Sequence, residues 1–318
     1  MSLIELIEQS AAQLESAGVG FGHGTTNAFD EAAWLVLWQL GLPLDTPLDD
    51  DTLLAKMPVG EVEYAQVAVL LEARIVSRKP AAYLTREAWL HGVAFYVDER
   101  AIVPRSFIAE LLVDGTIDAW LGTDTRRVLD LCTGNGSLAV LAAMAYPDVV
   151  VDASDISGAA LDVARINVDK HGLQDRITLF KSDGLLSLTQ PYDLILCNPP
   201  YVNAESMATL PAEYQAEPAL ALDGNRQGGS DGMDFIRTLL HQAPTRLTAE
   251  GVLVLEIGNE RHHFEAAFPK LDVVWLPTSA GMDQVLLVTA TTLQTPSTQL
   301  LVRVDMRDDL RADSAALN

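Results

Sequence analysis

The residues best suited to chemistry are Asn198-Pro199-Pro200-Tyr201, which follow an apolar run at 192–197. Two successive prolines fix φ and keep the residue before each of them extended. The side-chain carbonyl of Asn198 and the backbone carbonyl of Pro199 can then accept hydrogen bonds from one NH2 group, while the Tyr201 ring offers a face for stacking. The tetrapeptide predicts a site for an amide or an exocyclic amine, with a rigid turn at a strand end as the plainer interpretation.

A second segment with candidate binding residues lies upstream, at 130–136, and reads Asp-Leu-Cys-Thr-Gly-Asn-Gly. An apolar run precedes it, and a stretch of helical composition at 138–144 follows it. Strand, glycine turn and helix in that order let a ligand approach the backbone closely in an open α/β sheet. The candidate binding residues here are Asp130, Cys132, Thr133, Gly134, Asn135 and Gly136.

Carboxylates stand at the ends of three consecutive predicted strands, as Asp130, Asp155 and Asp183. Ligands of open α/β sheets bind at the carboxyl ends of the strands. Three anions at that edge repel a phosphate and attract a cation. The pattern therefore favours a cosubstrate with a sulfonium, an ammonium and a ribose diol over a nucleotide phosphate.

Together these motifs resemble the class I S-adenosylmethionine-dependent methyltransferases that act on planar amine nitrogens. Val103-Pro104-Arg105-Ser106, Glu217-Pro218-Ala219-Leu220 and the loop at 228–232 are similar to the glutamine N5-methyltransferases of the HemK/PrmC-like protein methyltransferase family. Gly22-His23-Gly24-Thr25 and the segment at 80–85 resemble the branch that acts on large-subunit ribosomal protein three. The likeness covers roughly residues 1–290.

The resemblance implies the chemistry and the roles of individual residues. The cofactor is S-adenosylmethionine as methyl donor, no metal takes part, and the acceptor is the side-chain amide of a protein glutamine. Residues 132–136 pass under the methionine part of the donor, Asp155 holds the ribose and Asp183 lies near the adenine. Cys132 replaces a glycine that is usual in the wider class. The implied catalytic residues are Asn198, Pro199 and Tyr201, and Asn198 is also expected to contact the cofactor. The implied substrate-binding residues are these three with Pro200, Glu217 and Pro218.

The order of elements predicts an α/β fold with a class I methyltransferase (Rossmann-like), seven-stranded, doubly wound sheet and a small helical N-terminal domain. Strands are expected at 128–131, 149–153, 177–181, 194–197, 252–257, 273–276 and 285–289, the last of them antiparallel by resemblance. The expected domains are a helical substrate-recognition domain at 1–88, a hairpin linker at 89–108, the methyltransferase domain at 109–290 and a poorly ordered tail at 291–318. The long segment at 202–232 is expected to form a lid.

Composition and charge limit the classes of partner that the protein is expected to bind. The net charge is −23, and no basic cluster is larger than Arg126-Arg127 or Arg78-Lys79, so a basic protein is a better partner than nucleic acid. The longest apolar run, at 138–146, is too short to span a membrane, and a cytoplasmic location is expected. The six histidines and two cysteines lack the spacing of a zinc site, and both cysteines are expected to be reduced.

Three alternatives remain open from the sequence. One is a methyltransferase for a glutamine of peptide-release factors, whose pattern differs at Ser106 and Phe107. Another is an N6-adenine DNA or N2-guanine RNA methyltransferase, because an aromatic amine fits the same acceptors. The third is a non-catalytic binding module of ribosome assembly that keeps the fold.

Overall fold

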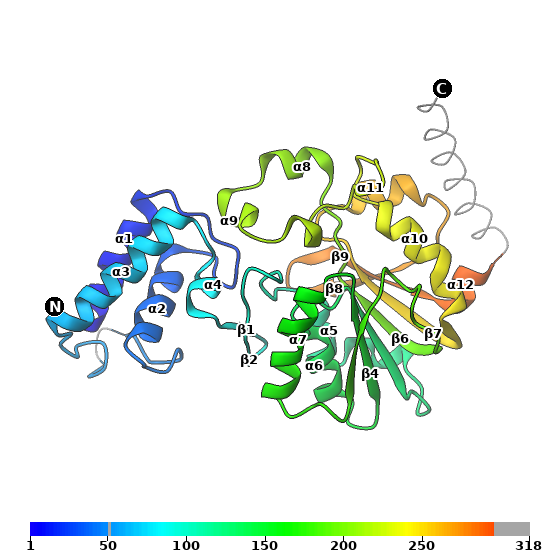
Figure 1. Cartoon of the computed structure of the whole chain (residues 1–318), viewed down its shortest axis with the longest axis horizontal. Coiled ribbons are helices and arrows are strands. Elements are labelled where there is room, and N and C mark those ends of the chain that lie inside the picture. The colour runs from blue at the N-terminus through cyan, green and yellow to red at the C-terminus, as the bar shows by residue number, and fades with distance from the viewer. Residues whose placement is uncertain (50–51, 296–318) are drawn as a thin grey trace.

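A seven-stranded sheet forms the centre of the larger domain in the computed structural model, which describes residues 1–49 and 52–295 (Figure 1). The strand order is β5-β4-β3-β6-β7-β9-β8, with parallel pairing from β5 to β7. β9 is antiparallel to both of its neighbours, as predicted. The strands are β3 (Arg127–Leu131), β4 (Val150–Asp155), β5 (Ile177–Lys181), β6 (Tyr192–Cys197), β7 (Leu247–Glu256), β8 (Val274–Thr278) and β9 (Gly281–Thr289).

Helices cover both faces of this sheet, so the predicted doubly wound architecture is confirmed (Figure 1). Successive side chains of β3 point to opposite faces of the sheet, so Val128 belongs to the core on one face and Leu129 to the core on the other. The first face carries α5 (Ile108–Val113), α6 (Ser137–Ala145) and α7 (Gly158–Lys170). The second carries α10 (Asp234–Gln242), α11 (Arg261–Ala267) and α12 (Ala290–Gln294). Short 3-10 turns lie at Thr116–Trp120 and Ala243–Thr245.

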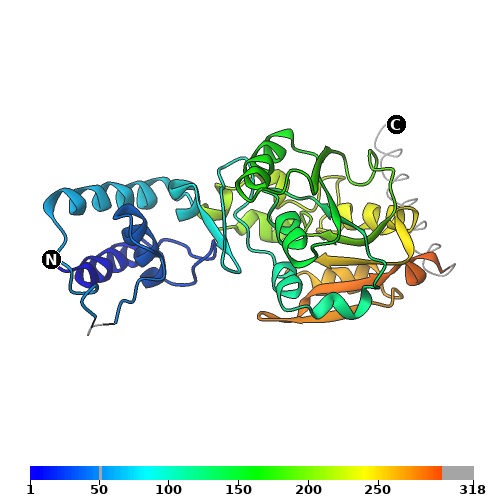
Figure 2. The ribbon, with the colours of Figure 1, turned by 90° about the horizontal axis from the view of Figure 1, so that it is seen from below.

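The N-terminal residues form a separate helical layer that projects from one side of the sheet domain (Figure 2). It contains α1 (Leu3–Ser16), α2 (Ala28–Gln39), α3 (Glu61–Ser77) and α4 (Ala81–Thr85), with an apolar core of its own. Ser2 begins α1 in a capping box with Glu5, and the Asn27 side chain begins α2 by accepting from Asp30 N at 2.9 Å. Across residues 1–49 and 52–295, no helix is long and apolar enough to cross a membrane.

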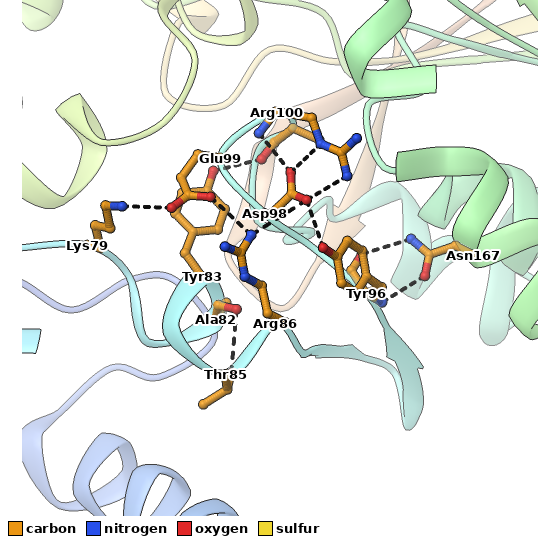
Figure 3. Close-up of polar contacts among 11 residues, drawn as sticks. Lys79, Ala82, Tyr83, Thr85, Arg86, Tyr96, Asp98, Glu99, Arg100 and Asn167 are labelled. Atoms are coloured by element: carbon orange, nitrogen blue, oxygen red, sulfur yellow. Dashed lines mark hydrogen bonds and ion pairs between the residues drawn. The ribbon is translucent and has the colours of Figure 1, made fainter. Parts of the chain in front are cut away.

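A short hairpin joins the two domains, as the alternation at 89–104 predicts. β1 (Ala88–Leu90) pairs with β2 (Val93–Phe95) in antiparallel register. The chain then docks on the sheet domain, because Tyr96 N donates to Asn167 Oδ1 at 2.7 Å and Asn167 Nδ2 donates to Tyr96 O at 2.9 Å (Figure 3). Toward the N-terminal domain, Glu99 of the linker pairs through Oε1 with Lys79 Nζ, which follows α3, at 2.7 Å. The linker is thus fixed to both domains.

The segment at 202–232, which we call the lid, folds into α8 (Ala204–Thr209), α9 (Ala212–Gln215) and a 3-10 turn at Ala219–Ala221. The lid reaches back to the N-terminal domain through Glu213, which is 1% exposed. Its Oε1 accepts from Gly20 N at 2.9 Å and lies 2.9 Å from Arg78 Nε and 3.5 Å from Arg74 Nη1. Arg74 is itself fully buried and donates from Nε to Glu31 Oε1 at 2.8 Å. A buried network of charges therefore ties the lid to α2 and α3.

The end of the sheet domain lies beyond the boundary predicted at residue 290. α12 begins at Ala290, where the Thr289 side chain accepts from Thr292 N, and Leu293 is 1% exposed within the core of the second face. The first residues of the segment predicted as a poorly ordered tail are therefore helical and packed. Residues 296–318 of that segment lie outside the described residues.

Replacement of Arg74 by alanine tests the network between the lid and the N-terminal domain. The change leaves Glu31 buried without its cation, so the free energy of unfolding should fall by ~3–5 kcal/mol. Denaturant unfolding measures this loss. The matched control is Arg165→Ala, whose pair with Asp162 is more than half exposed on both sides and should change stability by under ~1 kcal/mol. A loss below ~1 kcal/mol for Arg74→Ala would contradict a stabilising network.

Candidate active site

A cavity lies at the carboxyl ends of β3, β4 and β5, and we call it the strand-end cavity. The structure brings seven of the predicted site residues to its wall: Cys132, Gly134, Asp155, Asp183, Asn198, Pro200 and Pro218. The linker contributes Arg100 and Ile102, and Phe235 at the start of α10 completes the opposite side. The sequence did not indicate these three residues, because only the fold brings the linker and α10 to this edge.

The glycine turn forms the floor of the strand-end cavity. Cys132 has φ +61°, a left-handed conformation that side chains with a Cβ adopt at a cost of about 1 kcal/mol or more. This explains why glycine is common at the position in the wider class, and shows that the backbone keeps the turn with cysteine present. At Gly134 (φ +56°) a Cβ would meet no atom within 4 Å, so this backbone is open to a ligand.

The three strand-end carboxylates take different positions. Asp130 is 1% exposed; its Oδ2 accepts from Ala139 N at 2.9 Å and from the Thr133 hydroxyl, and its Oδ1 has no partner among the described residues. Burial raises the pKa of Asp130 to about 7. Asp155 lines the cavity and accepts from Gly134 N at 3.0 Å and Ser157 N at 2.8 Å. Asp183 is exposed at the rim.

Four predicted residues support the turn from behind and do not line the cavity: Asp130, Thr133, Asn135 and Gly136. Asn135 is 3% exposed, and its backbone carbonyl accepts from Asn167 Nδ2 at 2.8 Å. Asn167 is the residue that also holds the linker at Tyr96. The glycine turn and the linker are therefore held by one side chain.

A second cavity of about 530 Å³ lies between the two domains, and we call it the interdomain cavity. The N-terminal domain contributes Gly24 and Thr25 to its wall, and the linker contributes Arg105 and Phe107. The remaining wall comes from the tetrapeptide, the lid and the end of the sheet, and includes Asn198, Pro199, Tyr201, Tyr214 and Glu256. Residues from three parts of the chain thus meet around one space.

The tetrapeptide separates the two cavities. Pro199 and Tyr201 line the interdomain cavity, Pro200 lines the strand-end cavity, and Asn198 lines both. This alternation is what an extended backbone gives, and it agrees with the conformation that the two prolines impose. Among the described residues, the Asn198 side chain makes no hydrogen bond, so its carbonyl is free to accept from a ligand.

The Tyr201 ring is held by close packing against the backbone at Gly258. Gly258 has φ +52°, and a Cβ there would lie 2.6 Å from Tyr201 Cε2. Only glycine allows this approach. The ring therefore has a fixed position at the wall of the interdomain cavity.

Glu256, at the end of β7, is a site residue that our sequence reasoning missed. Its Oε2 accepts from the Ser106 hydroxyl at 2.5 Å and from Phe107 N at 2.9 Å, and the side chain lines the interdomain cavity. Burial raises the pKa of Glu256 to about 7, against these hydrogen bonds, which lower it. Its sequence signal is weak: Glu256 ends a buried strand, as Asp155 does, but no motif accompanies it.

Glu217, which was predicted to bind substrate, lies behind Arg105. Arg105 donates from Nη1 and Nη2 to the two oxygens of Glu217, each at 2.7 Å. Val103 N also donates to Glu217 at 2.9 Å, and His23 Nε2 lies 3.3 Å from it. Burial raises the pKa of Glu217, but the His23 contact and the Arg105 charge outweigh it and lower the pKa to about 2. Glu217 thus positions Arg105, which lines the interdomain cavity.

Comparison with known proteins places this geometry in a family. A model described as the methyltransferase small domain matches residues 109–224. A ribosomal protein uL3 glutamine methyltransferase of Bordetella pertussis is 51% identical, over 92% of this chain and 97% of that protein. Proteins of the same name from Burkholderia pseudomallei and Neisseria meningitidis serogroup B are 50% and 47% identical, over 91% and 90% of this chain and 94% and 92% of theirs.

The chain belongs to the uL3 glutamine methyltransferase family. This confirms the predicted resemblance, and the sheet order agrees with the predicted fold class. Because the match covers 92% of this chain, the family likeness extends beyond the methyltransferase domain and is not confined to the glycine turn.

Replacement of Glu256 by glutamine tests the buried carboxyl by its pH dependence. The folded protein holds a proton on Glu256 up to about pH 7, whereas the unfolded chain releases it near the usual carboxyl pKa, so the free energy of unfolding falls as pH rises between ~4.5 and ~7. Glu256→Gln lacks this loss and should gain stability relative to the unchanged protein between pH 5 and pH 8. Denaturant unfolding at both pH values measures it. Asp130 titrates in both proteins, so its contribution cancels in the comparison. Equal slopes of the free energy of unfolding against pH in the two proteins would refute the raised pKa of Glu256.

Proposed function

We propose that the protein transfers the methyl group of S-adenosylmethionine to the side-chain amide nitrogen of a glutamine in ribosomal protein uL3, large-subunit ribosomal protein three. The observation that carries the proposal is the position of Asn198, whose side chain borders both cavities. A methyl donor in one cavity and an amide in the other would meet at this residue. The names of the family members support the same reaction.

The residues that line the strand-end cavity carry groups that suit the methyl donor. When bound, S-adenosylmethionine supplies a methyl group on a positively charged sulfur. Asp155 keeps acceptor capacity for the ribose hydroxyls beyond its bonds to Gly134 N and Ser157 N, since a carboxylate has about four lone-pair positions. The open backbone at Gly134 gives room for the methionine part, and Asp183 lies at the rim for the adenine.

The tetrapeptide would orient the amide for attack. An amide nitrogen is a weak nucleophile because its lone pair is delocalised into the carbonyl. Hydrogen bonds from the NH2 group to Asn198 Oδ1 and the Pro199 carbonyl fix the direction of the nitrogen, and the Tyr201 ring limits the plane of the amide. Such placement lowers a barrier by several kcal/mol. After the new bond forms, these acceptors or solvent take the released proton, so no strong base is needed.

The N-terminal domain would select the protein substrate. Its loop at 22–26 lines the interdomain cavity, where the target side chain enters. Residues 1–100 hold 15 acidic and 6 basic residues, which suits a basic ribosomal protein better than an acidic one. The domain would therefore select the protein substrate by both its shape and its charge.

Methylation assays with purified proteins test the function. We expect the enzyme, S-adenosylmethionine and uL3 to give one added methyl group on a glutamine, located by mass spectrometry of the digested product. Competition with a peptide-release factor and with duplex DNA tests the alternatives. Faster methylation of the release factor would change the assigned substrate, and methylation of DNA would change the reaction class.

Replacement of Asn198 by alanine separates placement of the amide from binding of the donor. The variant loses one of two acceptors for the NH2 group, so kcat for uL3 should fall at least ~100-fold. Calorimetric Kd for S-adenosylmethionine should change far less, because the donor has other partners in its cavity. Turnover within a few-fold of the unchanged enzyme would place the target nitrogen elsewhere.

The matched control is Asp155→Ala, which should have the opposite profile. Loss of the ribose acceptor should weaken S-adenosylmethionine binding by ~1–3 kcal/mol. With saturating donor, kcat should largely recover, because the acceptors for the amide remain. Unchanged donor affinity in a folded Asp155→Ala protein would remove this carboxylate from the donor site.

A further inference from the structure

A third cavity, of about 620 Å³, lies between the N-terminal domain and the hairpin, and we call it the aromatic cavity. Its wall includes His23, Thr25, Trp34, Leu44, Trp89 and Pro104. The proposed reaction makes no use of it. Aromatic and aliphatic side chains dominate the wall, so an apolar group would gain free energy by entering.

Three buried polar atoms among the residues of this wall have no hydrogen-bond partner in the described chain. They are Nδ1 and Nε2 of His23, which is 2% exposed as a residue, and Nε1 of Trp34. A buried donor without a partner costs about 1–3 kcal/mol, and most buried polar groups in proteins are paired. Trp34 Nε1 can only donate, whereas His23 Nδ1 accepts in the neutral tautomer whose proton is on Nε2, toward Glu217. A polypeptide backbone offers a carbonyl for Trp34 and an N–H group for His23, and the rings must turn toward the cavity to meet them, because these atoms are closed to solvent in the unbound chain.

The lid fixes the orientation of His23. The His23 ring lies 4.3 Å from the Tyr214 ring between centroids, and Nε2 is 3.3 Å from Glu217 Oε2, a polar contact that is not a well-aligned hydrogen bond. Gly22 allows this packing, because a Cβ there would lie 2.4 Å from Tyr214 Oη. The contact with Glu217 is therefore structural, while Nδ1 is left for another partner.

The aromatic cavity continues into the interdomain cavity. Gly24 and Thr25 line both, so a single loop forms the border. A polypeptide that places a glutamine side chain beside Asn198 has neighbouring residues within reach of this loop, because each extended residue spans only ~3.3 Å. Trp34 Nε1 suits a backbone carbonyl of such a segment, and His23 Nδ1 suits a backbone N–H group.

We propose that the aromatic cavity is a second substrate subsite, which receives an apolar side chain of the polypeptide within a few residues of the target glutamine. A backbone carbonyl beside that side chain accepts from Trp34 Nε1. The inference rests on the proposed function and adds to it the feature of the substrate that this enzyme reads next to the glutamine.

The experiment combines enzyme and substrate variants. Trp89 is 47% exposed and lines the cavity, so Trp89→Ala should leave the fold intact. Trp34→Phe keeps a ring and removes the donor. Both variants should raise KM for uL3 about tenfold, with little change in kcat or in Kd for S-adenosylmethionine. The control is Tyr64→Ala, an aromatic residue of α3 that is 38% exposed outside the three cavities, which should leave KM unchanged.

Each apolar residue of uL3 within four positions of the modified glutamine is then changed to serine. At one position the serine substitution should raise KM for the unchanged enzyme and add no further penalty with Trp89→Ala, as expected for two groups in contact. Unchanged KM for Trp89→Ala and Trp34→Phe, or penalties that add at every position, would overturn the subsite. Failure of the proposed function is a different result, since the unchanged enzyme would then not methylate uL3.

Discussion

Two carboxylates buried in the lid hold the N-terminal domain, the linker and the sheet domain in one arrangement. Glu213 contacts Gly20, Arg74 and Arg78, and Glu217 contacts Arg105 in the linker and His23. Both glutamates are almost fully buried, so each needs its cations to offset the loss of solvent. The interdomain cavity exists only while these contacts keep its three walls together. The position of the proposed glutamine site therefore depends on ion pairs that lie outside it.

The tetrapeptide at 198–201 contributes a rigid backbone to the walls of both cavities. Its prolines keep the backbone extended, so successive side chains point in opposite directions. Pro199 and Tyr201 therefore line the interdomain cavity, and Pro200 lines the strand-end cavity. Gly258 then allows the Tyr201 ring to pack against the end of β7. Little of this depends on side chains that must be ordered when a substrate binds, which reduces the entropy lost in binding.

Local patterns were enough to predict the sheet and its strand-end groups. Apolar runs located all seven strands, and the parallel order of β5, β4 and β3 brings Asp183, Asp155 and Asp130 to one edge. The tetrapeptide was predictable because proline geometry is local. Glu256 also ended a strand, but no motif distinguished it from other acidic residues.

The contacts between distant segments could not be read from the sequence. Periodicity does not show that Glu213 meets Gly20, that Asn167 holds both the linker and the glycine turn, or that Trp34 and Trp89 face a common space. Those facts depend on how the domains dock, and docking is decided by packing over the whole chain. The end of the sheet domain was placed too early for a similar reason, since Leu293 becomes apolar core only once β7 and β9 are in place.

The network at Glu213 also has a consequence for how the protein is made. Its hydrogen bond to Gly20 joins residues 193 positions apart. At ~5–20 residues per second, the lid leaves the ribosome ~10–40 s after the loop that it must hold. During that interval Arg74 has Glu31 as its partner and lacks Glu213, and Arg78 lacks Glu213 as well, so the nascent N-terminal domain is without two of the ion pairs of the finished enzyme. Synthesis of the lid is thus the step that completes the first domain of the chain.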